Sequence, residues 1–408
     1  MEIVVVVGAG FSGVVASREL LRAGWQVVLV DPGARPGRGL AYSTAAPWHL
    51  LNSPASAMSI EPDDPGHFVR WCQARGVSGE FVSRGLYGDY LVEALRAADD
   101  MGSLTVHRGR VIRVFEGSVG MIVLLNDGVV IPADRVVLAL GNPPPGWVRG
   151  ATVQDPWAPG ALDGLPDGPV TLIGSGLTAV DVALTLARGG RHPRIEMVSR
   201  HGLLPRAHAS AGSFRLDGPK SRTLAGLMRE IRQMCEGDWR GAMDALRPHW
   251  NDLWARLSPE DRERFLRHVA RYWEVHRHRM APAVAREVDE LRAGGVLTLS
   301  TGLTGRYQII INCTGPGRLI DVDPLVRSLE AEGLARRGPH GLGLDVDEHG
   351  ALLPKRKIFT LGPARRGWLW ETTAAPEIRA QARSLSIHFC QLSLMAAGVS
   401  PRPPARRG

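Results

Sequence analysis

The chain begins Met1-Glu2-Ile3-Val4-Val5-Val6-Val7-Gly8-Ala9-Gly10-Phe11-Ser12-Gly13, and this stretch decides the fold. Its first part is mostly Val and Ile, the composition of a fully buried parallel strand. The second part reads G-x-G-x-x-G, and apolar residues then recur at helical spacing as far as Gly24. Residues 26–30 predict the next strand, which ends at Asp31. This order of strand, glycine turn, helix and strand is typical of a dinucleotide-binding unit.

Each position of the glycine turn has a predicted role. The first glycine allows the tight turn, the second lets the backbone approach a pyrophosphate, and the third lets helix and strand pack closely. The helix N-terminus would face the phosphates, and the acid at the end of the second strand would accept a hydrogen bond from a ribose hydroxyl. The predicted contact residues are Gly8, Gly10, Phe11, Ser12, Gly13 and Asp31. The alternative is an ordinary strand, turn and helix without a ligand.

A second fingerprint follows a linker rich in Gly and Pro. Residues 170–173 predict a strand, residues 174–179 read G-x-G-x-x-A, and residues 195–199 predict the following strand. Ser199 and Arg200 stand where an NAD site would place an acid, and an Arg can pair with a 2′-phosphate, so NADPH is favoured over NADH. The predicted NADPH-binding residues are Gly174, Gly176, Leu177, Thr178, Ala179, Ser199 and Arg200.

Composition indicates a globular protein of enzyme size. The chain has 408 residues, 44% of them hydrophobic, with a net charge of +8. Its arginines are scattered and no basic run carries interleaved aromatic residues, so we expect no nucleic-acid partner. No apolar run approaches the roughly 20 residues of a membrane span, and the first apolar stretch is a strand rather than a signal peptide. We expect a cytoplasmic protein without a membrane partner.

Cysteine and histidine patterns argue against a metal or dithiol centre. The four cysteines form no C-x-x-C pair, which speaks against a disulfide framework, a zinc site and a dithiol redox centre. Residues 212–294 predict a helical insertion in which Ser258 and Pro259 start a helix that continues to Met280. Its histidines lack a carboxylate or Cys partner at ligand spacing, so no metal is expected. This basic helix could bind an anion or substrate, or form surface and homodimer contacts.

A long loop without periodicity, residues 32–58, follows the first nucleotide motif. Such loops often hold a ligand, so this loop is expected to wrap the cofactor. Arg38 is a candidate for the pyrophosphate charge and Asn52 for a hydrogen bond near the reactive end. The alternative is that both residues only brace the loop. Residues 104–131 then predict a small antiparallel meander with a hairpin turn at Asn126-Asp127-Gly128, before a buried strand returns and ends at Gly141.

Two fingerprints in one chain resemble the flavoproteins that are built from two dinucleotide-binding domains. The segments 37–42, 49–52, 87–91 and 372–379 also resemble the bacterial FAD/NAD(P)-binding family called YdhS-like. The resemblance implies FAD in the first domain and NADPH in the second. It places Gly141 at a conserved turn of the superfamily, Gly362 at the end of its last cofactor strand, and Thr372 and Thr373 beside the isoalloxazine ring. For Thr373 the alternative role is a helix cap.

Two departures from the superfamily pattern bear on the chemistry. Gly362 is followed by Pro363 where the superfamily usually has the Asp that holds the ribityl chain. The F-x-G-x-x-x-H fingerprint of several oxygenating flavoenzymes is also absent from the sequence.

The predicted fold is therefore α/β, with two Rossmann-like domains, a small antiparallel meander and a helical insertion at about 212–294. Residues 1–165 form the first part of the FAD domain, residues 166–300 the NAD(P)H domain, and residues 301–408 complete the FAD domain and add a basic tail.

The function expected from the resemblance is an NADPH-dependent flavin monooxygenase. It would use O₂ and a C4a-peroxyflavin to oxygenate a small polar amine or amino acid, possibly by N-hydroxylation, as in a biosynthetic oxidoreductase. The alternatives are an FAD-dependent dehydrogenase or reductase without oxygen insertion, and a flavin-binding redox sensor without a substrate. No catalytic residue beyond the cofactor sites is assigned.

Overall fold

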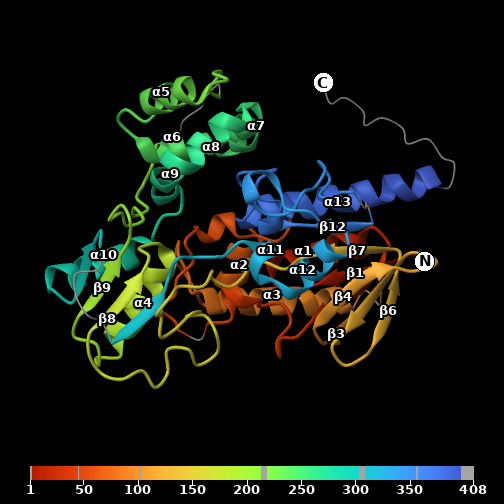
Figure 1. Cartoon of the computed structure of the whole chain (residues 1–408), viewed down its shortest axis with the longest axis horizontal. Helices are drawn as coiled ribbons and strands as arrows, with labels where there is room; N and C mark the ends of the chain where they lie inside the picture. Colours follow the sequence, from red (N-terminus) through yellow and green to blue (C-terminus); the bar gives the residue numbers. More distant parts are fainter. Residues whose placement is uncertain are drawn as a thin grey trace.

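The protein is represented by a computed structural model, which describes residues 2–44, 46–100, 103–212, 218–302, 308–354 and 357–396. The basic tail that the sequence predicts at 401–408 lies outside these residues. Two parallel sheets lie at opposite ends of the long axis, and a lobe of helices projects to one side (Figure 1). The α/β fold class is confirmed.

The first sheet has five parallel strands in the order β12-β7-β1-β2-β3. Its strands are β1 (Ile3–Val7), β2 (Gln26–Asp31), β3 (Leu104–Arg108), β7 (Arg135–Leu138) and β12 (Ile358–Thr360). The helices of this part are α1 (Phe11–Arg22), α2 (His67–Gln73), α3 (Arg84–Asp99) and α13 (Ala375–Ala396). Because β12 pairs with β7, residues near the C-terminus complete a sheet that the first residues begin.

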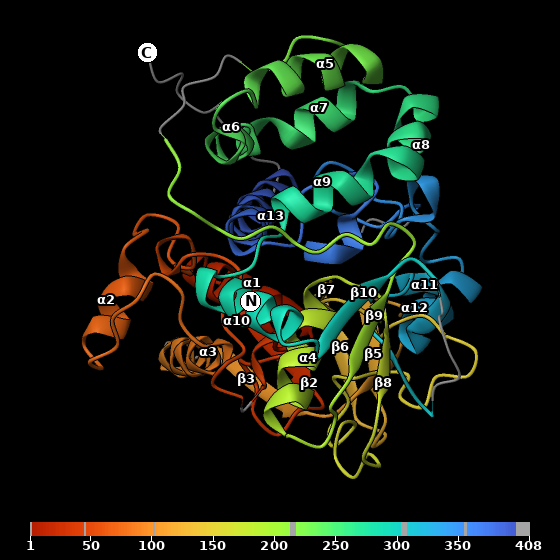
Figure 2. The same cartoon turned by 90° about the vertical axis from the view of Figure 1, so that its left-hand side faces the viewer.

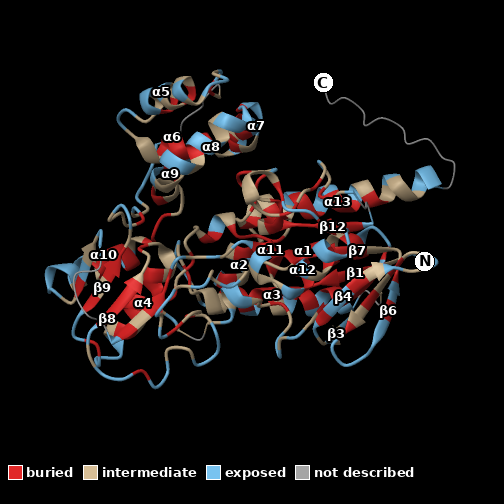
Figure 3. Cartoon of the chain, viewed as in Figure 1, coloured by how far each residue is buried: buried red, intermediate tan, exposed pale blue. Residues whose placement is uncertain are grey.

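Both faces of the central strands are covered, which explains why β1 and most of β2 are apolar. One face packs against α1, α3 and α13, and residues of alternate position pack against the meander and two short helices. Those helices are α11 (Leu319–Val322) and α12 (Pro324–Ala331). Figure 3 shows the buried residues gathered on the central strands and on the helix faces turned toward them.

The antiparallel meander comprises β4 (Val111–Glu116), β5 (Met121–Leu125) and β6 (Val130–Ala133). Its hairpin turn is where the sequence predicts it, with Gly128 at a φ of +88°. The meander is smaller than expected, because residues 104–108 pair in parallel with β2 and belong to the first sheet.

The second sheet has four parallel strands in the order β10-β9-β8-β11. They are β8 (Val170–Ile173), β9 (Ile195–Val198), β10 (Leu297–Ser300) and β11 (Ile309–Asn312). Helices α4 (Leu177–Arg188) and α10 (Pro282–Ala293) pack into its core. The last strand extends this sheet to Asn312, beyond residue 300, at which the sequence-based division ends the second domain.

The helices between β9 and α10 form a lobe with its own core. This helical lobe consists of α5 (Leu224–Met234), α6 (Trp239–Ala245), α7 (Trp250–Arg256), α8 (Pro259–His268) and α9 (Ala270–Arg277). Ser258 caps α8 as expected, accepting a hydrogen bond from the Asp261 N–H at 3.2 Å. The expected continuous helix to Met280 is wrong, because the chain bends at Val269 and again after Arg277.

The helical lobe sits over the C-terminal segment, and both Figure 1 and Figure 2 show this lobe above the two sheets. Trp370, which lies outside the insertion, belongs to the lobe's apolar core and stacks on Trp254 with ring centroids 5.1 Å apart. Short 3-10 turns complete the described elements at Leu40–Tyr42, Ala55–Ala57, Arg247–His249, Pro339–Gly341 and Gly362–Arg365. None of the helices in the described ranges combines the length and apolar character that crossing a membrane requires.

Trp25 lies at a contact between the N-terminal part of the chain and α13, and its replacement tests how much this contact stabilises the fold. It is 6% exposed and packs against Phe389 of α13 with ring centroids 5.6 Å apart. Replacing a buried Trp by Ala typically costs about 3–5 kcal/mol, so Trp25→Ala should lower the unfolding midpoint clearly. Trp147→Ala is the matched control because Trp147 is 81% exposed, and it should change stability by less than about 0.5 kcal/mol. Urea denaturation followed by circular dichroism measures both, and equal effects would contradict the packing described.

Candidate functional site

The first glycine turn lies at the carboxyl end of β1 and is shaped by its neighbours. Gly8 has a φ of +101°, and a Cβ at this position would lie 2.6 Å from the carbonyl oxygen of Ala139. A Cβ on Gly13 would lie 1.8 Å from the Gly8 carbonyl oxygen. Neither position can carry a side chain without moving the backbone, so the first and third glycines serve the steric roles that the sequence predicts.

The N-terminus of α1 suits an anion. Gly10 is the cap residue and offers no side chain to the first-turn N–H groups, while Phe11 and Ser12 are buried in that turn. Backbone N–H groups without a capping side chain, together with the helix dipole, favour a phosphate. The residues present therefore fit the pyrophosphate of a dinucleotide.

The long loop crosses this turn at close range. The Gly37 N–H donates to the Ala9 carbonyl oxygen at 2.7 Å, and a Cβ on Gly39 would lie 2.7 Å from the Gly10 Cα. The second glycine of the fingerprint thus faces the loop backbone, which brings this loop to the position expected for a cofactor-wrapping segment.

Asp31 holds the first glycine turn in place through hydrogen bonds to its carboxylate. One carboxylate oxygen accepts from the Ala9 N–H and the other from the Gly33 N–H, each at 2.7 Å. Each oxygen can accept a further hydrogen bond, so a ribose hydroxyl can still be bound. That ribose contact stays a prediction.

Arg38 and Asn52 occupy different parts of the long loop. Arg38 forms an ion pair with Asp89 and points toward the carbonyl oxygens of Tyr42 and Gly85 at 3.4 and 3.3 Å. These contacts fit the bracing alternative, and its role at the pyrophosphate stays a prediction. The backbone carbonyl of Asn52 accepts a hydrogen bond from His208 Nε2 at 3.0 Å. This part of the loop therefore contacts the segment after β9.

A segment near the C-terminus, residues 362–381, meets the first turn of α1. A Cβ on Gly362, which has a φ of +69°, would lie 3.1 Å from Ser12 Oγ. The Thr372 hydroxyl donates to the Gly362 carbonyl at 2.8 Å, and Gln381 closes the network by accepting from the Gly362 N–H and donating to Thr372, both at 2.9 Å. Thr373 follows, partly exposed, just before α13.

Gln381 was missed in the sequence. The absence of the usual acid after Gly362 could have indicated it. Where a strand end lacks its polar partner, a polar residue of the following helix can take its place. Gly141, with a φ of +68°, follows the return strand β7 as expected.

The second glycine turn repeats the geometry of the first. Gly174 has a φ of +119°, and a Cβ there would lie 2.3 Å from the Cys313 carbonyl oxygen. Gly176 caps α4 without a side chain, so the first-turn residues Leu177, Thr178 and Ala179 again present backbone N–H groups. This turn fits a second dinucleotide.

Polar groups from three segments surround the second turn. The Ser175 hydroxyl bonds to Ser199 Oγ at 2.7 Å and to the Leu203 carbonyl at 2.6 Å. Arg271 of the helical lobe donates to both Ser175 Oγ and the Leu203 carbonyl, at 3.1 and 3.0 Å. Arg200 is exposed. Sequence reasoning missed Arg271 because it lies more than seventy positions after Ser199.

Buried contacts hold the long loop and α3 against α4. Arg84 forms an ion pair with the buried Asp181 at 2.8 Å, and His49 Nε2 lies 2.9 Å from the Thr185 hydroxyl. Burial lowers the pKa of His49 even though the Asp181 carboxylate opposes this. His49 therefore acts as an uncharged hydrogen-bonding group between the long loop and α4.

A second set of ion pairs ties the helical lobe to the N-terminus of α13. Arg247 makes a bidentate contact with Glu377 at 2.6 and 2.7 Å, and Arg277 contacts the buried Glu371 at 3.1 Å. Burial raises the pKa of Glu371. Burial also acts to raise the pKa of Glu377, but the hydrogen bonds and charge of Arg247 outweigh it and lower that pKa. These arginines of the insertion are thus neutralised by protein carboxylates.

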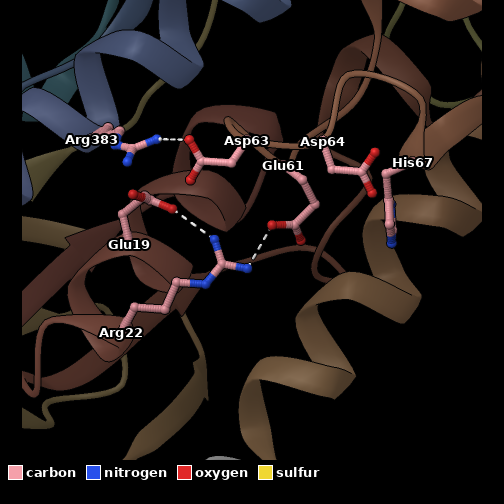
Figure 4. Close-up of a pocket in the computed structure, with 7 residues that line it drawn as sticks. All are labelled: Glu19, Arg22, Glu61, Asp63, Asp64, His67 and Arg383. Carbon is pink, nitrogen blue, oxygen red and sulfur yellow. Dashed lines mark hydrogen bonds and ion pairs between the residues drawn. The ribbon is translucent and has the colours of Figure 1, made fainter.

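A polar hollow of about 520 Å³ lies between α1, the segment before α2 and α13 (Figure 4). Its arginines are matched by its acids: Arg22 contacts Glu61 and Glu19 at 2.6 and 2.8 Å, and Arg383 contacts Asp63 at 2.7 Å. This hollow is a network of ion pairs at the surface. Within the part of the chain that the structure describes, His, Cys, Asp and Glu side chains form no group of three able to hold a metal ion.

Two parallel sheets, each with a glycine turn that opens a helix, define the class of fold: two dinucleotide-binding-like domains in one chain. Residues 5–143 match the model of a family described as FAD-NAD(P)-binding, so this part of the chain is an FAD/NAD(P)-binding domain. No curated protein matches the sequence. The expectation of an FAD/NAD(P)-binding domain is confirmed for these residues, whereas the narrower YdhS-like resemblance stays a prediction.

Solved structures share the fold over nearly the whole length. The L-lysine 6-monooxygenase from Pseudomonas syringae is 15% identical, with 96% of this chain and 99% of that chain covered and a TM-score of 0.63. The ornithine hydroxylase from Pseudomonas aeruginosa has the same identity and coverage and a TM-score of 0.60. The thioredoxin reductase from Lactococcus lactis is 11% identical, covers 97% of this chain and 100% of its own, and has a TM-score of 0.53. At these identities the likeness establishes the fold.

Gly10 provides the direct test of the first site. Gly10→Val places a branched side chain between the loop backbone and the expected pyrophosphate, so the purified protein should lose most of its bound FAD. Gly146→Val is the matched control, because a Cβ on Gly146 meets no atom within 4 Å. Flavin absorbance per protein measures the outcome, with circular dichroism as a check of folding. Full flavin content in Gly10→Val would show that the site is assigned wrongly.

Proposed function

We propose that the chain is an NADPH-dependent flavin monooxygenase that oxygenates a small polar amine or amino acid. The observation that supports this most is the pairing of two glycine turns, each opening a helix without a side-chain cap, on two separate parallel sheets. The reaction balances as NADPH, H⁺, O₂ and substrate giving NADP⁺, water and the oxygenated substrate.

The cysteines support oxygenation over dithiol exchange. All four cysteines, which lie within the described residues, are free. Burial raises the pKa of the Cys72, Cys235 and Cys313 thiols, and a thiol is reactive only as the thiolate. A reductase that passes electrons through a dithiol needs two neighbouring cysteines, and the four free cysteines of this chain form no such pair.

Bound FAD would supply the redox chemistry, accepting a hydride from NADPH and reducing O₂. The protein would position the flavin with the α1 N-terminus, Ser12, Gly362 and Thr372. The N-terminus of α13 would direct its partial positive charge toward the flavin, where negative charge develops on reduction. Glu377 in the first turn of this helix is already neutralised by Arg247, so its charge does not cancel that effect fully.

Three groups at the second turn support NADPH. The Ser199 hydroxyl is held by Ser175, Arg200 is exposed beside it, and Arg271 approaches the same turn from the helical lobe. Two guanidinium groups near one strand end suit a 2′-phosphate better than a bare ribose hydroxyl.

The substrate proposal rests on likeness to relatives. The names of two proteins with this fold identify them as acting on lysine and ornithine. Both are amino acids that carry a side-chain amine, which is the class of nucleophile that we propose here.

The domain division is part of the same proposal. Residues 1–165 and 301–408 would bind FAD and residues 166–300 NADPH, and the pairing of β12 with β7 supports the return of the chain to the first domain. The pairing of β11 with β8 favours moving the second limit to about Asn312. We also propose a cytoplasmic location, and a homodimer as the first assembly to test.

Arg200 tests the preference for NADPH. A charge-assisted hydrogen bond contributes about 1.5–3 kcal/mol, so Arg200→Ala should raise the KM for NADPH roughly tenfold to a hundredfold and leave that for NADH almost unchanged. Arg194→Ala is the control because Arg194 is an exposed arginine before the same strand. Flavin reduction by each cofactor, followed by stopped-flow absorbance, gives the measurement. An equal loss with both cofactors would refute a contact to the 2′-phosphate.

Oxygen use separates the proposed reaction from its alternatives. A screen of amines and amino acids should find compounds that stimulate NADPH oxidation, with isotopically labelled O₂ appearing in the product and little hydrogen peroxide released. Turnover at full rate without O₂ and with an organic electron acceptor would assign the chain to the dehydrogenases or reductases. Absence of any substrate-dependent NADPH oxidation would support the redox-sensor alternative.

A further inference from the structure

The apolar core of the helical lobe is interrupted by a half-open cavity of about 450 Å³. Protein interiors normally contain few voids larger than a water molecule. Pockets that bind small organic molecules typically measure about 300–1,000 Å³. The size of this cavity is therefore that of a ligand site.

Aromatic side chains dominate the walls. Five of the eleven tryptophans of the chain line this one cavity, and they are Trp239, Trp250, Trp254, Trp273 and Trp370. Leu, Ile, Met, Val and Phe side chains make up much of the remaining wall. Apolar walls hold water poorly, and flat indole rings favour an occupant with an apolar body that can stack on them.

Three of these tryptophans lack a hydrogen-bond acceptor. The Nε1 atoms of Trp250, Trp273 and Trp370 are buried without a partner in the described part of the chain, and the residues are only 5, 8 and 5% exposed. By contrast, Trp254 Nε1 donates to the Gly367 carbonyl at 2.9 Å. Buried donors are nearly always satisfied in folded proteins. In the present side-chain arrangement these three Nε1 atoms are covered and are not exposed to the cavity, so each ring must rotate before its N–H can donate to an occupant.

The charge of the lining is of one sign. Arg232, His268 and His276 line the cavity, and the first two are exposed to solvent. No Asp or Glu is among the described residues that line it. An anionic group would be attracted to this side, whereas an ammonium group would find no carboxylate partner.

We propose that this cavity binds an aromatic or acyl carboxylate, with its apolar body between the tryptophans and its carboxylate near Arg232 and His268. Small rotations of the indole rings would let the unsatisfied N–H groups donate to oxygen atoms of the ligand. None of the residues that line the cavity belongs to either glycine turn, so the proposal does not depend on the proposed function, and its ligand is distinct from the small polar amine proposed as substrate.

The test uses the full-length protein loaded with FAD and NADP⁺, so that both nucleotide sites are filled. The probe is 1-anilinonaphthalene-8-sulfonate, an apolar aromatic anion, and binding is followed by energy transfer from tryptophan to the probe. We expect saturable binding of the probe. In competition, 4-phenylbutyrate should displace it at a concentration at least about tenfold lower than 4-phenylbutylamine, which has the same apolar body and the opposite charge.

Two variants locate the binding. Met228 lines the cavity and is only partly buried, so Met228→Trp should narrow the cavity without disturbing the core. Arg232→Glu reverses the charge at the exposed side. Each should weaken the probe about tenfold or more. Arg222→Glu is the matched control, since Arg222 is exposed in the same insertion and does not line the cavity, and it should bind the probe like the unmodified protein.

Several results would overturn the proposal. They are unchanged binding in Met228→Trp, equal losses in Arg232→Glu and Arg222→Glu, or displacement by the amine as effective as by the acid. Far-ultraviolet circular dichroism of each variant establishes that the helical lobe remains folded. If Met228→Trp loses helix, Met228→Phe takes its place. Loss of FAD binding or of NADPH oxidation in other tests would bear on the proposed function and leave this result unaffected.

Discussion

The same steric constraint shapes both glycine turns. In each unit the carbonyl oxygen at the end of a neighbouring strand lies where the Cβ of the first glycine would be: Ala139 lies against Gly8 and Cys313 against Gly174. Both glycines also have positive φ angles, which L side chains rarely adopt. This contact lets the strand, the turn and the helix pack closely, and it leaves the helix N-terminus open toward the position of a phosphate.

The contacts between the units depend on this arrangement. Because α4 begins at the second glycine turn, its Asp181 is placed to pair with Arg84 of α3, and its Thr185 meets His49 of the long loop. The loop in turn lies on the first glycine turn through Gly37 and Gly39. The same loop thus contacts the first glycine turn and the helix that the second glycine turn opens.

The helical lobe is attached differently, through charges and tryptophans. Arg247 and Arg277 pair with Glu377 and Glu371, and Trp370 enters the lobe's apolar core. These attachments fall on the residues just before and at the start of α13. The insertion is therefore joined directly to the segment that we propose borders the flavin.

Local patterns made much of the site predictable. The two glycine fingerprints, the Ser258 cap, the Gly128 hairpin and the return of the chain at Gly362 can each be read from a few adjacent residues, because turns and caps are set by local backbone sterics. The missed or mistaken features depend on distant partners. The break at Val269 interrupts a regular apolar pattern, the strand 104–108 joins the parallel sheet, and Gln381 and Arg271 reach positions far away in sequence.

The sequence by itself determined the class of fold and the two glycine turns, since short-range sterics and burial demand glycine at these positions and apolar runs before them. Only the tertiary structure decided which charged groups are already paired, as Arg38, Arg247 and Arg277 are, and which remain exposed, as Arg200 is. It also decided that five tryptophans from separate helices and from the C-terminal segment surround one cavity. The physical reason is that pairing and cavity formation depend on distances between side chains, which the order of residues along the chain does not give.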